Sequence, residues 1–185
     1  GMMMMGKSVE PLKDSPSFSH ILTAFNNPLV GVLAGAIITA VIQSSAASIG
    51  ILQSLSITGH ITYGMAIPII MGQNIGTCVT ALISSIGVNR SARRVAVIHI
   101  AFNCIGTIIL LPILYLVNAF VDFVFMDWTI SYAGIALVHT IFNVVVTFLL
   151  LPFSKLLEKL AYLVIKQLPE ETQKEQLILP GEILL

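Results

Sequence analysis

Two short polar segments interrupt an otherwise apolar sequence, and they hold the side chains best suited to binding a solute. The first segment comprises Gln43, Ser44 and Ser45, and the second comprises Gln73, Asn74, Thr77 and Thr80. Polar groups within a bilayer must be satisfied by partners or by a bound ligand. A lone Ser or Thr can bond back to its own helix. Several amides and hydroxyls at predicted helix breaks instead favour a binding site.

The residue types indicate which solute such a site would take. The N-terminus of an interrupted helix exposes free N–H groups, which favour an anion. Carbonyls at the C-terminus of an interrupted helix, together with Ser, Thr, Asn and Gln oxygens, suit a dehydrated sodium ion. The sequence has no Asp or Glu between Pro28 and Asn89, which weakens a proton relay. We therefore expect an oxyanion accompanied by sodium, and phosphate, sulfate or a small carboxylate would satisfy the same groups.

Three other functional classes compete with a transporter. A serine hydrolase needs an activated serine, but QSSAAS lacks the G-x-S-x-G pattern, and His99 and His139 have better packing explanations. We therefore do not expect an enzyme. We also expect no metal site other than one for sodium, because no further metal ligands lie at suitable spacing near the histidines. A passive anion channel also lines its path with hydroxyls and amides. A structural membrane scaffold is the third alternative, and the paired helix breaks count against it.

Composition and charge distribution predict an integral membrane protein. Of the 185 residues, 56% are apolar and 10% charged, whereas soluble domains carry about 25% charged residues. No Lys, Arg, Asp or Glu occurs between Pro28 and Asn89, so the lipid bilayer or other membrane helices must surround this stretch. The net charge of zero gives no electrostatic basis for nucleic-acid binding. Cys78 and Cys104 are expected to be packing residues.

The apolar segments predict an all-α fold. Residues 28–42 and 46–57 are each too short to span a bilayer, which favours a re-entrant helical hairpin with its polar tip near mid-membrane; a single tilted helix is the alternative. A span over residues 61–87 is expected to unwind locally over residues 72–77, where two glycines bracket two amides. Two full transmembrane helices follow, and then an amphipathic surface helix. The last three elements are predicted at residues 95–117, 131–153 and 154–166.

The two full spans share an internal repeat at an offset of 40 residues. His99, Phe102 and Asn103 in VAVIHIAFNCIGTIILLPI match His139, Phe142 and Asn143 in IALVHTIFNVVVTFLLLPF. Because adjacent spans run in opposite directions, this pattern indicates an inverted duplication. We interpret the two H-x-x-F-N motifs as polar contacts between helices.

Charge asymmetry predicts the orientation in a plasma (inner) membrane. A basic loop and a basic C-terminal segment are expected on the cytoplasmic side, and an acidic loop on the outer side. The basic residues are Arg90, Arg93 and Arg94 in the loop and Lys155, Lys159 and Lys166 in the C-terminal segment, and the acidic residues are Asp122 and Asp127.

The polar segments also carry a family resemblance. TAVIQSSAASIGILQSL, followed by MGQNIGTCVTALISSIG, resembles the type II sodium–phosphate cotransporter family, and ARRVAVIHIAFNCIGT and HTIFN fit its bacterial branch. The resemblance implies two inverted repeats that hold inorganic phosphate and sodium between them, with sodium as the coupling ion and no other cofactor. It assigns Gln43, Ser44 and Ser45 to phosphate, and Gln73, Asn74, Thr77 and Thr80 chiefly to sodium.

The sequence departs from the family pattern in two respects. Ala46 stands where the family often has a third serine, and a single Q-S-S motif is present, of the kind found in the second repeat. The chain is therefore expected to be a fragment, or else a half-size protein that pairs with the missing first repeat or a second copy. We predict an interfacial lead-in at residues 1–27, a transporter repeat at 28–153, and an amphipathic surface helix with a polar tail at 154–185. The direction of transport, uptake or export, stays open.

Overall fold

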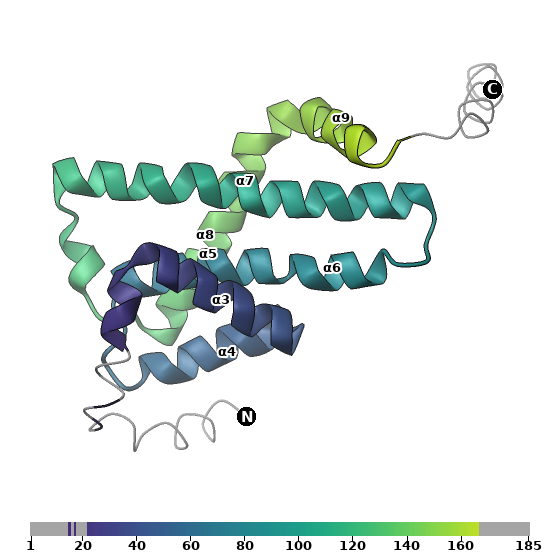
Figure 1. Ribbon diagram of the computed structural model, residues 1–185. Coiled ribbons are helices and arrows are strands. Elements are labelled where there is room, and N and C mark those ends of the chain that lie inside the picture. The colour runs from purple at the N-terminus through teal and green to yellow at the C-terminus, as the bar shows by residue number, and fades with distance from the viewer. Residues whose placement is uncertain (1–14, 16, 18–21, 167–185) are drawn as a thin grey trace.

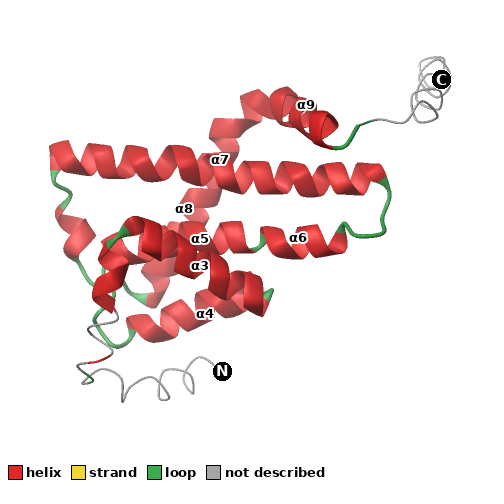
Figure 2. Ribbon diagram, viewed as in Figure 1, coloured by secondary structure: helices red, strands yellow, loops and turns green. Residues whose placement is uncertain are grey.

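The computed structural model describes residues 15, 17 and 22–166, so most of the predicted lead-in and the polar tail lie outside the described residues. Helices make up the regular structure of this part of the chain (Figure 1 and Figure 2). Among the described residues, three helical stretches are long and apolar enough to cross a membrane, at Tyr63–Ser84, Arg90–Val121 and Tyr132–Val164. The predicted all-helical membrane architecture is confirmed at this level.

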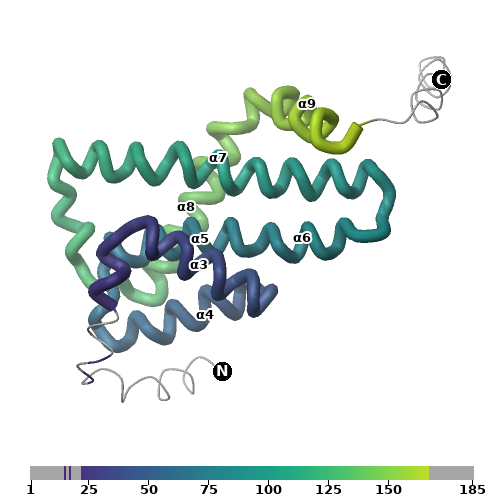
Figure 3. The backbone as a smooth tube through the Cα atoms, in the orientation of Figure 1, coloured from purple at the N-terminus to yellow at the C-terminus, as the bar shows by residue number. Residues whose placement is uncertain are grey.

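The first apolar region forms two helices that fold back on each other. A short η2 turn (Ala24–Asn26) precedes α3 (Pro28–Ile42), and α4 (Ser45–Ser56) follows after a tight turn. Asn27 caps α3 by accepting a hydrogen bond from the Leu29 N–H at 2.9 Å, with Pro28 in the first helical position. Gln43 ends α3 in the left-handed conformation (φ 57°), and Figure 3 shows the chain reversing between α3 and α4. The predicted interruption after Ile42 is confirmed.

The next span consists of α5 (Tyr63–Gly76) and α6 (Cys78–Ser84). The predicted unwinding over residues 72–77 is wrong in its extent, because α5 stays helical through Gly76 and only Thr77 separates it from α6. The Thr77 N–H still reaches the Gln73 carbonyl at 3.2 Å, and the Thr80 N–H turns to the Thr77 carbonyl at 3.2 Å. The span is therefore a nearly continuous helix that tightens at one residue.

The glycines that suggested unwinding allow close packing of α3 against α5. A Cβ atom at Gly72 would overlap the carbonyl oxygen of Val32, and one at Gly35 would overlap the carbonyl oxygen of Ile69. Only glycine permits two backbones to approach this closely, as in other small-residue helix contacts within membranes. Figure 1 shows α3 in front of α5, and the two helices are in contact along much of their length. This contact fixes the hairpin on the span.

The long helix α7 (Arg90–Val121) begins earlier than predicted. The expected basic loop is wrong, because Arg90, Arg93 and Arg94 lie in the first turns of α7. The physical reason is a local cap, since the Asn89 side chain accepts a hydrogen bond from the Ala92 N–H at 2.9 Å. The helix then runs through Pro112 and ends at the predicted acidic loop.

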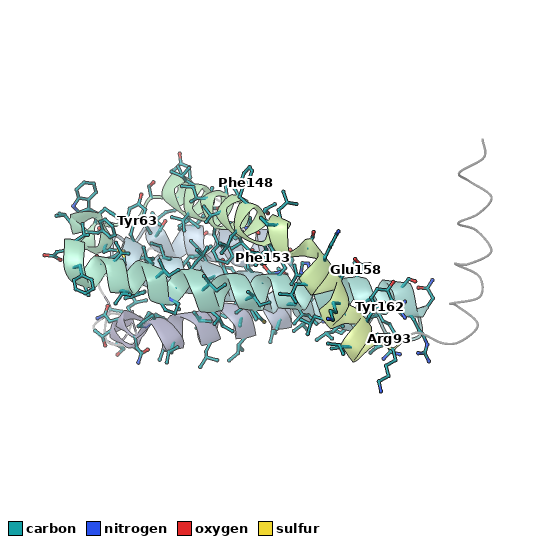
Figure 4. All side chains as sticks on the ribbon, turned by 90° about the horizontal axis from the view of Figure 1, so that it is seen from above. Tyr63, Arg93, Phe148, Phe153, Glu158 and Tyr162 are labelled. Atoms are coloured by element: carbon teal, nitrogen blue, oxygen red, sulfur yellow. The ribbon has the colours of Figure 1, made fainter. Side chains whose placement is uncertain are left out.

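After η3 (Val124–Asp127), α8 (Tyr132–Leu150) and η4 (Leu151–Phe153) lead into α9 (Ser154–Val164). The amphipathic helix α9 crosses over the beginning of α7 (Figure 4). Arg94 holds it there, because its Nε donates to the Ile165 carbonyl at 3.1 Å and its guanidinium lies 4.3 Å from the centre of the Tyr162 ring. Arg90 donates to the carbonyl of Lys166.

Both ends of the α3–α4 hairpin lie at the end of the molecule opposite to these arginines. Leu22, before α3, and Leu52, in α4, belong to one buried cluster with Ile61 and Ile130. The Ile130 N–H donates to the Ile61 carbonyl at 2.9 Å, which ties the loop after the hairpin to the loop before α8. The hairpin therefore enters and leaves at the end that carries the acidic loop, and it stops short of the far end of α6 (Figure 3).

Candidate solute-binding site

The hairpin tip presents the first predicted group of site residues. Gln43 is exposed, whereas Ser44 and Ser45 are half-buried at the beginning of α4. Ser44 caps this helix, because its hydroxyl accepts a hydrogen bond from the Ala47 N–H at 3.3 Å. The N-terminus of α4, with its partial positive charge and free N–H groups, therefore lies at the tip.

A buried chain of hydrogen bonds connects the hairpin to α5 one turn behind the tip. The Thr39 hydroxyl of α3 donates to the Ser48 hydroxyl of α4 at 2.7 Å. The Gln73 Nε2 of α5 donates to the Ser48 carbonyl at 3.0 Å. All three residues are buried, so these bonds lie away from solvent and link the three helices at one point.

Gln73 contributes an acceptor that these bonds do not use. Its Oε1 is fully buried and accepts no hydrogen bond among the described residues, while the Nε2 of the same amide is engaged by Ser48. Leaving a buried acceptor unsatisfied costs about 1–3 kcal/mol. Such a group in a membrane helix points to a ligand or partner group that donates or carries positive charge.

The second polar segment contacts both H-x-x-F-N motifs. The Asn74 Oδ1 accepts from the Asn143 Nδ2 of α8 at 3.2 Å, and the Thr77 hydroxyl lies 3.4 Å from the His99 Nε2 of α7. Within α7, the Asn103 Nδ2 donates to the His99 carbonyl at 3.0 Å. These contacts agree with the interpretation of the two motifs as polar links between helices, and they bring both motifs to the point where α5 ends.

The structure brings only some of the predicted site residues together. Gln73, Asn74 and Thr77 lie on consecutive turns at the junction of α5 with α6, but Thr80 is exposed on α6. The hydrogen bond from α5 reaches the hairpin at Ser48, which also accepts from Thr39, rather than at the residues of the tip.

Sequence analysis missed Thr39 as a member of the site. The signal that could have found it is the spacing of Gly31, Gly35 and Thr39, which recurs every four residues and marks one face of α3. This is the face that packs on α5. Thr39 continues this row of glycines, so its hydroxyl lies in the interface between α3 and α5.

Histidine, cysteine and carboxylate side chains are scattered over the part of the chain that the structure describes. That part contains no group of three or more His, Cys, Asp or Glu side chains able to hold a metal ion. Its two cysteines, Cys78 and Cys104, are free. The oxygens at the helix junction belong to amides, hydroxyls and carbonyls, which suit a hard monovalent cation.

Comparison with known proteins identifies the family. The family model described as Na+/Pi-cotransporter matches residues 1–137. The chain is 37% identical over 91 residues to the uncharacterized protein YqeW of Bacillus subtilis, which covers 49% of this chain and 30% of that protein. It is 38% identical over 94 residues to sodium-dependent phosphate transport protein 2A of the rat, which covers 48% of this chain and 15% of that protein.

A third relative is more distant but matches a longer stretch of this chain. The putative inorganic phosphate export protein YjbB of Escherichia coli is 27% identical over 111 residues, which covers 60% of this chain and 20% of that protein. The matched region is thus a minor part of each of the three relatives. No solved structure matches the chain.

Proposed function

Because the chain belongs to the Na+/Pi-cotransporter family, we propose that it supplies one repeat of a sodium-coupled transporter of inorganic phosphate. The family is one of transporters rather than enzymes, and relatives named for phosphate transport support this assignment. The observation that carries the proposal is the buried, unsatisfied Oε1 of Gln73, at the junction of the hairpin with α5. Sodium would satisfy this acceptor without a protein carboxylate.

In this proposal the sodium site forms where α5 ends. Gln73 Oε1 supplies a free oxygen, and the Asn74 and Thr77 oxygens lie within the next turn. The Thr77 hydroxyl donates to the Asn74 carbonyl at 2.6 Å, so its oxygen keeps a lone pair for a cation beside its contact with the His99 ring. Thr80, one turn further along α6, would join when another element covers its exposed side.

Phosphate would bind at the hairpin tip. Gln43, Ser44 and Ser45 offer one amide and two hydroxyls beside the N-terminus of α4, whose free N–H groups and dipole favour an anion. Sodium at the end of α5 would offset the charge of the anion, since no Asp or Glu lies in this region. The exposure of Gln43 fits a site that a further element completes.

We place the hairpin in the bilayer as a re-entrant element. α3 and α4 would be about 22 Å and 18 Å long at 1.5 Å per residue, which is less than the roughly 30 Å of a hydrocarbon core. Because the hairpin enters and leaves at one end of the molecule, its polar tip would lie within the membrane. The basic residues of α7 and α9 would face the cytoplasm, and the acidic loop would face outward.

We further propose that this region, residues 28–153, corresponds to the second of two inverted repeats. The first repeat, or a second copy of the chain, would close the site over the tip. The surface helix α9 and the polar tail would follow as the segment at 154–185.

Sodium binding can be tested without requiring transport. Thermal unfolding of the purified chain should shift upward in sodium relative to potassium, because a ligand that binds the folded state raises its stability. Gln73→Leu should abolish this shift. Gln53→Leu should retain it, because Gln53 is also a buried amide but donates to the Tyr132 carbonyl at 2.9 Å, away from the junction. Equal melting temperatures in sodium and potassium for the unsubstituted chain would refute the sodium site.

Transport itself is tested by uptake of radiolabelled phosphate into proteoliposomes under an inward sodium gradient, with potassium as the control. Uptake that requires sodium supports the cotransport mechanism. Equal uptake in both salts would favour a passive anion channel, whereas sodium binding without uptake would indicate that the first repeat must be supplied.

A further inference from the structure

An apolar cavity outside the polar site lies beneath the surface helix. It has a volume of about 560 Å³ and lies between α7, α8, η4 and α9, within the range of about 300–1,000 Å³ common for small-molecule sites. Its walls include Ile105 and Ile109 of α7, Leu149 of α8 and Phe153 of η4. The single charged residue among those that line it is Lys159.

Three faces of α9 explain why the cavity is apolar and has a lysine in its lining. Leu157 and Ala161 are buried. Leu156, Leu160 and Leu163 line the cavity, yet between 37% and 68% of their surface is exposed, so the cavity opens along this leucine row. Lys155 and Lys159 lie one turn apart on the next face of the helix, beside the leucines. Amphipathic helices with this order of faces lie at membrane interfaces.

Positive charge gathers at the same end of the molecule. Among the described residues, six basic side chains and one acidic side chain, Glu158, lie in α9, in the residues directly after it and in the first turns of α7. The remaining charged side chains, Asp122 and Asp127, lie at the opposite end. The apolar cavity, with Lys159 in its lining and Lys155 one turn away on the same helix, therefore lies at the end of the molecule where lipid head groups would lie.

We propose that this cavity binds an anionic phospholipid, with an acyl chain against the leucine row and the phosphate on Lys159 and Lys155. The apolar walls match a hydrocarbon chain, whereas free phosphate would leave them uncovered. A neutral zwitterionic lipid would place its cationic group near the lysines and gain less. A protein segment would have to bring its own carboxylate to pair with Lys159. The bound lipid would hold α9 against α7 and α8.

The test uses a single tryptophan at the cavity. In the full chain, Trp128→Phe removes the one native tryptophan, and Phe153→Trp places a reporter in the cavity wall. The protein is reconstituted in vesicles in which brominated phosphatidylglycerol or brominated phosphatidylcholine replaces an increasing fraction of unbrominated phosphatidylcholine. Half-maximal quenching should need about fivefold less of the anionic lipid per contributing lysine.

Two charge-matched variants distinguish a site from general attraction to the basic end. Lys159→Gln should reduce the preference for the anionic lipid by about fivefold. Arg93→Gln removes the same charge from an exposed residue that does not line the cavity, and it should leave the preference nearly unchanged. Adding inorganic phosphate should not alter either quenching curve.

Several results would overturn the proposal. Identical curves for the two lipids would mean ordinary boundary lipid, and the absence of quenching by either would mean that a protein segment covers the cavity. Loss of the preference in inorganic phosphate would mean that the lysines bind the free ion. Native mass spectrometry of the unsubstituted chain, which should retain phosphatidylglycerol over phosphatidylcholine, tests the same point without a reporter.

Discussion

The span that carries the candidate sodium residues and the two spans that follow it differ in their surroundings. In the most apolar part of Tyr63–Ser84, 61% of the residues are buried, against 28% in Arg90–Val121 and 28% in Tyr132–Val164. The first of these spans meets α3 through glycines and contacts α7 and α8 through amides and a hydroxyl. The other two, which we call the outer spans, expose large apolar side chains instead. Tight backbone packing and polar bonding thus coincide at the site, whereas the outer helices are built to face lipid or another subunit.

The largest effect is expected where α3 and α5 meet. Gly72→Ala adds a Cβ atom that would overlap the Val32 carbonyl oxygen, so the two helices must separate. We expect a loss of about 3 kcal/mol or more in the free energy of unfolding, measured by SDS titration in mixed micelles. The control is Gly50→Ala in α4, where a Cβ atom would meet nothing within 4 Å and the change should be close to neutral. Equal losses at Gly72 and Gly50 would contradict the close contact of α3 with α5.

A smaller loss should follow from breaking the buried bond behind the hairpin tip. Ser48→Ala leaves the Thr39 hydroxyl without its 2.7 Å acceptor and should cost about 1–3 kcal/mol in the same titration. Ser54→Ala is the control, because Ser54 is also buried in α4 but donates only to the Gly50 carbonyl of its own helix. Adding Thr39→Val to Ser48→Ala should cost less than the sum of the two single changes, since both partners are then removed. Strict additivity would argue against the bond.

The sequence predicted features that depend on composition and local pattern. The long stretch without charges required a membrane, and the polar break at Gln43 predicted a turn that the structure contains. The glycines at 72 and 76 were misinterpreted, because glycine permits both an unwound helix and a close helix contact, and only the partner helix decides between them. The basic residues after Asn89 suggested a loop by charge alone, although the Asn89 cap makes them helical. Thr39 was missed because a hydroxyl in an apolar helix can bond back to its own helix, and the row of glycines that it continues marks an interface only when those glycines pack against another helix.

An effect of intermediate size is expected where α9 is attached to the beginning of α7. Arg94→Met keeps most of the apolar stem but removes the bond to the Ile165 carbonyl and the contact with the Tyr162 ring. A hydrogen bond from a charged group contributes about 1.5–3 kcal/mol and a cation–π contact about 0.5–1 kcal/mol. Amide hydrogen exchange in α9 should therefore become at least about tenfold faster, with α3 and α5 unaffected. Arg93→Met should leave exchange in α9 unchanged, because Arg93 is exposed; equal acceleration by both variants would attribute the effect to charge alone.

The smallest change in the free energy of unfolding is expected for a substitution on the exposed face of α8. Its size shows whether lipid or protein covers that face. The Phe148 side chain is 72% exposed, whereas Phe142, two turns earlier in the same helix, is 4% exposed and packs in the core with Met71 and Val146. If lipid covers the outer face, Phe148→Leu should change the free energy of unfolding by less than about 0.5 kcal/mol. Phe142→Leu should cost about 1 kcal/mol or more, because it leaves unfilled space in a packed core. SDS titration of both variants measures the difference. Similar losses would mean that protein covers Phe148 in the assembled transporter, and the outer spans would then be an interface between repeats rather than a surface for lipid.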